Sequence, residues 1–236
     1  MEVQLASAKI NKYAVSESGD TLEFVERPHG GVSVVLADGQ TSGRGAKAVS
    51  ILVVRKVIGL LAEGVRDGAA ARAASDALFT EKNGKVSSTL NIMSVDLHTK
   101  TVVLTQNNPA PVLVARGKKI ELFEPNSKPV GVARNTRPSI AEIPLERGLM
   151  VIIFTDGLVH AGELRGKAMD IPATLRELLD GDDLNSQDIA DALLARAMQL
   201  DDGRPGDDIS VVVMRVVPLR GDAVRRVALR LPIQAG

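Results

Sequence analysis

The stretch Val-Ser-Val-Val-Leu-Ala-Asp-Gly, residues 32–39, joins a continuous apolar run to an acidic residue and a glycine. A short, β-branched run of this kind is typical of a strand that is buried on both faces. Asp38-Gly39 favours a turn, so the strand is expected to end there. From residue 46 to 63 apolar residues recur at helical spacing, and an alanine-rich segment follows over 67–79. The sequence therefore predicts a buried strand followed by two helices.

Two other apolar strands also carry an aspartate at one end. Residues 149–155 run into Asp156-Gly157, and residues 209–217 begin directly after Asp207-Asp208. A further aspartate, Asp20, lies in a turn after the first predicted strand. Loops at strand ends cluster in space, so these carboxylates are expected to converge if the strands are neighbours.

The remaining segments predict a meander of strands followed by a second pair of helices. The strands span residues 88–97, 101–106, 112–116, 119–123 and 140–143, and the helices span residues 169–179 and 186–200. Short connections indicate antiparallel hairpins, and the order of elements indicates a single α+β domain over residues 1–217. Residues 218–236 are expected to form a C-terminal extension. The alternating pattern of residues 224–233 predicts an edge strand, and the three arginines of this stretch leave open a basic segment that docks a partner.

Converging aspartates would place several negative charges in one small space. The nearest basic residues, Arg44, Lys47 and Arg204, are not adjacent to them in the sequence. Crowded carboxylates either take raised pKa values or bind cations, and carboxylate oxygen is a natural ligand for Mg²⁺ and Mn²⁺. Two such ions can activate a water for phosphoryl transfer. The alternative is purely structural, because Asp-Gly is a common turn dipeptide.

The composition argues against several classes of function. The 236 residues include 29 basic and 29 acidic side chains, no cysteine, four Phe, one Tyr and no Trp. Without a basic surplus or aromatic platforms, no nucleic-acid partner is expected. Without cysteine there are no disulfides and no thiolate metal sites. No apolar run approaches the roughly 20 residues of a membrane helix, and the N-terminus lacks the pattern of a signal peptide. We therefore expect no membrane partner and a cytoplasmic location.

Four short motifs, in this order, resemble the metal-dependent protein serine/threonine phosphatases of the PPM group. They are Ser18-Gly19-Asp20, Ala37-Asp38-Gly39, Phe154-Thr155-Asp156-Gly157 and Gly206-Asp207-Asp208-Ile209-Ser210. The chain looks most like the bacterial SpoIIE-type branch, and residues 88–97 and 107–114 are similar to the central hairpins of that branch. The resemblance runs from about residue 5 to residue 217, as in a compact, stand-alone member of the partner-switching or stressosome feedback kind.

The resemblance implies an α-β-β-α sandwich of two antiparallel sheets flanked by helix pairs. It also implies a centre that holds two Mn²⁺ or Mg²⁺ ions. Asp38 would bridge the ions, with Asp20 and the carbonyl of Gly39 on one of them and Asp156 and Asp207 on the other. A bridging water would attack phosphoserine or phosphothreonine directly, without a phosphoenzyme. Asp38, Asp156 and Asp207 would thus be catalytic through activation of this water.

Other positions near these motifs have a functional and a structural interpretation. Asp208 is expected to orient a metal-bound water, with a cap at the strand start as the alternative. His160 could protonate the leaving group, or it could be a surface or capping residue. The arginine that binds substrate phosphate in eukaryotic relatives has no clear match, and the glycine-rich stretch after Gly39 is longer than the common bacterial form. Affinity would then come mainly from docking a protein.

These points together predict a metal-dependent protein phosphatase with a phosphorylated protein substrate. By analogy with compact members of the branch, the substrate would be an anti-sigma-factor antagonist or a stressosome-type scaffold protein in a bacterial signalling system. Two alternatives stay open. One is a catalytically weak phosphoprotein-binding module with a phosphatase-like fold, and the other is a metallohydrolase of small phosphoesters.

Overall fold

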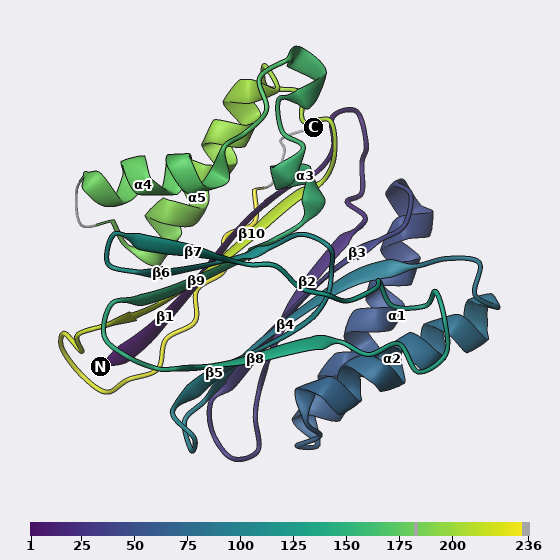
Figure 1. Ribbon diagram of the computed structural model, residues 1–236, viewed down its shortest axis with the longest axis horizontal. Coiled ribbons are helices and arrows are strands. Elements are labelled where there is room, and N and C mark those ends of the chain that lie inside the picture. Colours follow the sequence, from purple (N-terminus) through teal and green to yellow (C-terminus); the bar gives the residue numbers. More distant parts are fainter. Residues whose placement is uncertain (182–183, 233–236) are drawn as a thin grey trace.

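The computed structural model describes residues 1–181 and 184–232 and contains two five-stranded antiparallel sheets (Figure 1). The first sheet, in spatial order, consists of β1 (Glu2–Ile10), β10 (Ile209–Val217), β9 (Leu149–Phe154), β6 (Val112–Arg116) and β7 (Lys119–Phe123). The second consists of β2 (Asp20–Glu26), β3 (Val32–Gly39), β4 (Ser88–Asp96), β5 (Thr101–Asn107) and β8 (Ser139–Pro144).

Two pairs of helices cover the outer faces of the sheets. α1 (Gly43–Ala62) and α2 (Asp67–Lys82) pack on the second sheet, and α4 (Ile171–Asp180) and α5 (Ser186–Leu200) pack on the first (Figure 1). The short α3 (Asp156–Val159) follows β9 directly. This four-layer order confirms the predicted α-β-β-α sandwich. In the described part of the chain, no helix combines the length and the apolar composition needed to cross a membrane.

Three apolar layers explain why the strands are apolar without a break. Val34 and Leu36 of β3 belong to the layer between the two sheets, whereas Val35 and Ala37 belong to the layer beneath α1 and α2. Successive side chains of a strand point to opposite faces, and here both faces are covered. A third layer lies between the first sheet and the helices α4 and α5.

Within residues 1–217 the predicted strands and helices are present, with ends that differ by a few residues. β2 was not predicted, because Asp20 was expected to lie in a turn. α2 continues to Lys82, where Asn83 takes a left-handed conformation with φ of 52° and ends the helix. α4 begins at Ile171 because the side chain of Asp170 accepts a hydrogen bond from the N–H of Ala173 at 2.9 Å, as an N-cap does.

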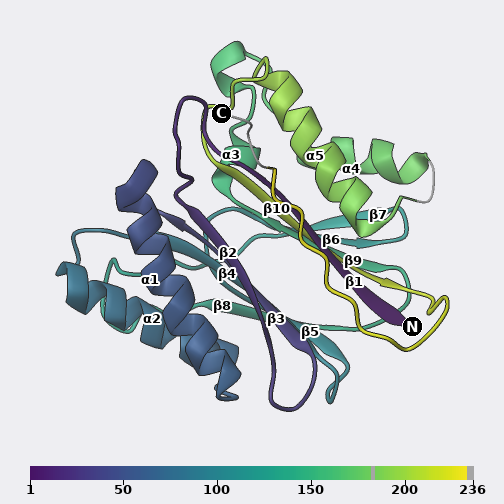
Figure 2. The ribbon, with the colours of Figure 1, turned by 180° about the vertical axis from the view of Figure 1, so that it is seen from behind.

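The C-terminal extension differs from the expected edge strand. Residues 218–232 form neither a helix nor a strand, and the side chains of residues 219–232 are exposed. Figure 2 shows this segment, in yellow, turning back from the end of β10. Arg225 donates a hydrogen bond of 2.7 Å to Glu26 at the end of β2. This ion pair is exposed, so it contributes little to stability.

Candidate metal centre

Asp20 and Asp38 bring two carboxylates together at one end of the second sheet. β2 begins at Asp20 and β3 ends just after Asp38, and the antiparallel register places these two residues opposite each other. Burial raises the pKa of Asp38 to about 9, and the negative charges of Asp20, Asp156 and Asp207 add to the shift. Asp38 therefore lies close enough to each of the other three carboxylates for their charges to act on it.

Asp156 and Asp207 reach this centre from the first sheet. Phe154 pairs with Val211 across β9 and β10, so Asp156, just after β9, and Asp207, just before β10, extend from the same end. Burial raises the pKa of Asp156, and the charge of Asp207 contributes. Asp20 is fully buried, Asp38 and Asp156 are half-buried, and Asp207 is exposed. The centre therefore opens to solvent on the side of Asp207.

The carboxyl group of Asp20 has one satisfied and one unsatisfied oxygen. Its Oδ2 accepts hydrogen bonds from the hydroxyls of Ser210 at 2.6 Å and Thr155 at 3.1 Å. Its Oδ1 is buried and has no hydrogen-bond partner. A buried acceptor without a partner is costly, and mainly through burial the pKa of Asp20 is raised to about 6. A divalent cation would satisfy this oxygen.

The oxygen atoms of these aspartates suit a hard divalent cation, although their carboxylates alone do not surround a metal position. Within residues 1–181 and 184–232, no three acidic or histidine side chains are arranged to hold a metal ion by themselves. Carboxylate oxygens with excess negative charge suit Mg²⁺ or Mn²⁺, which commonly retain several waters. The fit thus rests on charge, on oxygen donors and on the unpartnered Oδ1 of Asp20.

Two lysines lie at this centre, and the sequence had not singled out Lys9. Lys9 of β1 and Lys47 of α1 both donate to the main-chain oxygen of Asp20, at 2.6 and 2.7 Å. Lys47 also donates to the hydroxyl of Thr21 at 3.0 Å. Burial of the Lys9 ammonium lowers its pKa, and the charge of Lys47 lowers it further. Lys47, one of the basic residues nearest to the aspartates in the sequence, therefore reaches Asp20 in the fold although it is not adjacent to an aspartate in the chain. Lys9 can be placed near Asp20 only once the pairing of β1 with β10 is known, because that pairing sets Lys9 opposite Ser210.

Asp208 uses its carboxylate to hold a loop. One oxygen accepts the N–H of Lys12 at 2.9 Å, and the other accepts the N–H of Gly19 at 2.7 Å. Gly157 packs so closely here that a Cβ on it would lie 2.0 Å from the main-chain oxygen of Asp208. Both interactions fix the main chain around Asp20, Asp156 and Asp207. Asp208 is buried, and its partners are main-chain groups on the loop before β2.

Other polar residues near the centre have defined partners. His160 lies 3.0 Å from Glu163, with both side chains exposed, and its charge acts to lower the pKa of Asp156. Asp201, which the sequence did not single out, is buried and accepts the N–H groups of Gly162 at 2.9 Å and Gly206 at 3.3 Å. Asp201 thereby joins the segment after Asp156 to the segment before Asp207.

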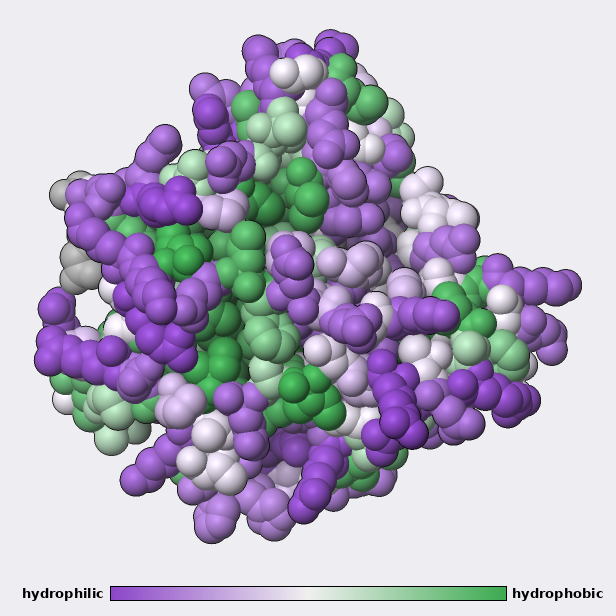
Figure 3. Space-filling view, viewed as in Figure 1, coloured by the Kyte–Doolittle hydropathy of each residue, from purple (hydrophilic) through white to green (hydrophobic). Residues whose placement is uncertain are grey.

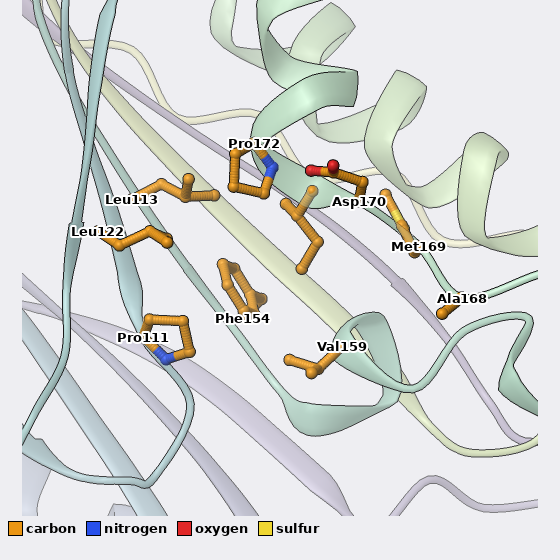
Figure 4. A pocket seen from close by; sticks show the side chains of 10 residues that line it. Pro111, Leu113, Leu122, Phe154, Val159, Ala168, Met169, Asp170 and Pro172 are labelled. Atoms are coloured by element: carbon orange, nitrogen blue, oxygen red, sulfur yellow. The ribbon is translucent and has the colours of Figure 1, made fainter.

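A separate cavity of about 380 Å³ lies between the first sheet and the start of α4 (Figure 4). Its lining consists of Pro111, Leu113, Leu122, Phe154, Val159, Ala168, Met169, Asp170, Ile171 and Pro172. Figure 3 shows apolar surface gathered over this part of the molecule. The one carboxylate in the lining, that of Asp170, caps α4. The cavity therefore lacks the polar groups that phosphoryl chemistry requires.

Comparison with solved structures identifies the class of this fold. The PP2C phosphatase domain of SpoIIE from Bacillus subtilis is 20% identical, with a TM-score of 0.79 over 92% of this chain and 63% of that one. The catalytic domain of the serine/threonine phosphatase PstP, solved with two manganese ions, is 16% identical, with a TM-score of 0.68 over 92% and 99%. A structure reported for the bacterial stressosome is 15% identical, with a TM-score of 0.69 over 91% and 100%. The chain therefore has the fold of PP2C-type phosphatases.

The family assignment comes from the sequence match. Residues 28–217 match the family model described as stage II sporulation protein E (SpoIIE), and the chain belongs to that family. A curated relative, the stage II sporulation protein E of Priestia megaterium, is 22% identical over 200 residues. The match covers 84% of this chain and 34% of that relative. The chain thus spans about a third of the length of that protein.

Proposed function

We propose that this chain is a Mn²⁺- or Mg²⁺-dependent protein phosphatase that hydrolyses phosphoserine or phosphothreonine on a partner protein. One observation carries the proposal: burial and the charges of Asp20, Asp156 and Asp207, which come from both sheets, raise the pKa of Asp38 to about 9. Such a group is stable in its charged form only beside cations. Membership of the SpoIIE family supports phosphatase chemistry as the use of that centre.

Each carboxylate has a proposed role in holding two ions. Asp38, between the others, would bridge them. Asp20 and the carbonyl of Gly39 would hold one ion, and Asp156 and Asp207 would hold the other. When bound, the ions would supply a water of lowered pKa and positive charge to stabilise the phosphoryl transition state. The hydroxyls of Thr155 and Ser210 orient the Asp20 carboxylate, and two lysines hold its main chain.

A phosphorylated protein suits this centre better than a small phosphoester. Asp207 is exposed at the opening of the centre. The cavity between the first sheet and the start of α4 is apolar and lined by other residues. We propose a phosphorylated anti-sigma-factor antagonist or stressosome scaffold protein as the substrate, within partner-switching signalling. Similarity to a structure reported for the bacterial stressosome supports this class of partner.

Hydrolysis of p-nitrophenyl phosphate and of a phosphorylated antagonist-domain protein tests the proposal. The wild-type protein should act on both with Mn²⁺ or Mg²⁺ and lose activity with a chelator. Asp38→Asn should abolish both reactions, whereas Asp96→Asn, in the hairpin at the opposite end of the second sheet, should not. A folded wild-type protein that binds the phosphoprotein but releases no phosphate with either metal would favour the binding-module alternative. High turnover of free metabolites without any gain on protein substrates would favour the small-molecule hydrolase.

A further inference from the structure

Three exposed side chains surround the segment that leads into Asp207. The N–H of Tyr13 donates to the main-chain oxygen of Pro205 at 2.9 Å, and the guanidinium of Arg204 lies 5.3 Å from the centre of the Tyr13 ring. Leu164 approaches from another segment, because a Cβ built on Gly206 would lie 3.5 Å from its Cδ1. We call Tyr13, Leu164 and Arg204 the rim.

The rim is apolar and positively charged, and it is free to contact another molecule. Leu164 is 86% exposed and Tyr13 is 55% exposed. Arg204 is exposed too, and no acidic side chain in residues 1–181 or 184–232 forms an ion pair with it. A stacked guanidinium still has free N–H donors. Aromatic side chains and arginine are enriched where proteins contact their partners.

The rim has a rigid base, so its position relative to the metal centre is fixed. Asp201 joins the segments that carry Leu164 and Arg204 through its two hydrogen bonds to main-chain N–H groups. Asp208 ties the loop of Tyr13 to the start of β10 in the same way. In Figures 1 and 2, the loop before β2, the turn after α3 and the loop before β10 all lie at the same end of the molecule.

We propose that the rim docks the segment of the substrate protein that flanks the phosphorylated residue. The occupant is a segment that carries an acidic side chain and an apolar side chain beside phosphoserine or phosphothreonine. The acidic group would pair with Arg204, and the apolar group would pack against Leu164 and Tyr13. This inference rests on the proposed function, and it adds a reason for the choice of substrate that the metal centre alone does not provide.

Two phosphothreonine peptides of equal length test the proposal. One carries Glu and Leu on both sides of the phosphothreonine, and the other carries Lys and Gly. With Mn²⁺ the wild-type protein should have a kcat/KM for the first peptide about fivefold or more above that for the second. A difference of this size is expected because the second peptide lacks the side chains that would contact the rim. The double variant Arg204→Glu and Leu164→Ala should lose this preference while its rate on p-nitrophenyl phosphate is unchanged. The wild-type preference should also shrink in high salt.

Matched controls separate the rim from general surface effects. Leu97→Ala and Arg147→Glu change the same residue types in turns at the opposite end of the sheets, and they should retain the preference. Equal preference in the wild type and the rim variant would overturn the docking proposal, and so would a rim variant that slows p-nitrophenyl phosphate to the same degree. A wild-type protein inert on p-nitrophenyl phosphate would instead overturn the proposed function, and the docking role with it.

Discussion

Asp20 and Asp38 face each other across the β2–β3 ladder, one fully buried and the other half-buried. Across a strand pair, like charges directly opposite are destabilising. The fold tolerates this pair because Lys9 and Lys47 reach the main chain of Asp20 and because the folded protein can hold a proton on Asp38. In the metal-bound protein, cations would replace that proton.

In the absence of metal, the free energy of unfolding should therefore fall as the pH rises. Burial and neighbouring carboxylates raise the pKa of Asp38 from 3.8 to about 9. At pH values between 3.8 and about 9, folding is therefore accompanied by uptake of a proton. The contribution to stability is fully present below pH 3.8 and is lost as the pH rises through about 9. Chemical denaturation with a chelator present, at a series of pH values up to about 9, measures this slope.

Asp38→Asn supplies the control for that slope, because the amide does not titrate. Its unfolding free energy should vary less with pH over the same window, and in the alkaline part it should exceed that of the metal-free wild type. A wild-type protein whose stability rises from neutral to alkaline pH without metal would contradict the convergence of the four carboxylates.

Millimolar Mn²⁺ should raise the melting temperature of the wild-type protein. An ion that binds only the folded state stabilises it by mass action, by about 2.7 kcal/mol when its concentration is a hundred times Kd. Asp207→Asn should weaken the effect without unfolding the protein, because Asp207 is exposed. Differential scanning fluorimetry with and without chelator measures both. A melting curve insensitive to both Mn²⁺ and Mg²⁺ would count against the metal centre.

The sequence could predict the strands and their acidic ends because these signals are local. The unbroken apolar run before Asp38 and the Asp-Gly turn after it are both readable from neighbouring residues. Lys9 could not be found in this way. Its place depends on the pairing of β1 with β10 and on the packing of one sheet on the other, which brings its ammonium to Asp20.

The contacts of Asp208 could not be predicted from the sequence either. Its position beside Asp207 predicts a role in orienting a metal-bound water, and that role stays a prediction. What the structure adds is that its carboxylate accepts two main-chain N–H groups from the loop before β2. That loop has little regular structure, so its path is set by tertiary contacts rather than by hydrophobic periodicity. The rim was missed for this reason too, since Tyr13 and Leu164 lie on irregular segments.

Lys47→Met should make the protein less stable without metal and more responsive to Mn²⁺. The variant loses two hydrogen bonds from a charged donor, which should lower the unfolding free energy by about 1–2 kcal/mol. It also removes a fixed positive charge from the acidic centre, so a divalent cation meets less repulsion. Lys56→Met, at an exposed position of the same helix, is the matched control. An equal Mn²⁺-induced shift in melting temperature for both variants would contradict this role.

Arg27→Met should destabilise the protein without affecting the metal centre. Arg27 donates to Asp67 at 3.0 Å and to the main-chain oxygen of Val65 at 3.1 Å, and the two side chains of the ion pair are only 18% and 8% exposed. Burial already raises the pKa of Asp67, so removing its partner leaves a buried, uncompensated carboxylate. The loss should be about 3 kcal/mol by denaturant titration. The Mn²⁺-induced shift in melting temperature should be the same as in the wild type, which would show that the metal centre is intact.

Two glycine-to-alanine changes should have opposite effects on stability. At Gly157 a Cβ would lie 2.0 Å from the main-chain oxygen of Asp208, so the strand end and α3 would have to separate. Because Asp156 and Asp207 flank this contact, Gly157→Ala should lower both the melting temperature and the response to Mn²⁺. Gly59 lies exposed within α1 with no atom near its would-be Cβ, so Gly59→Ala should stabilise the protein by about 0.5–1 kcal/mol through helix propensity. Thermal unfolding with and without Mn²⁺ tests the pair. A Gly157→Ala protein with wild-type stability and metal response would show that the close approach of these two main-chain segments is not needed to assemble the centre.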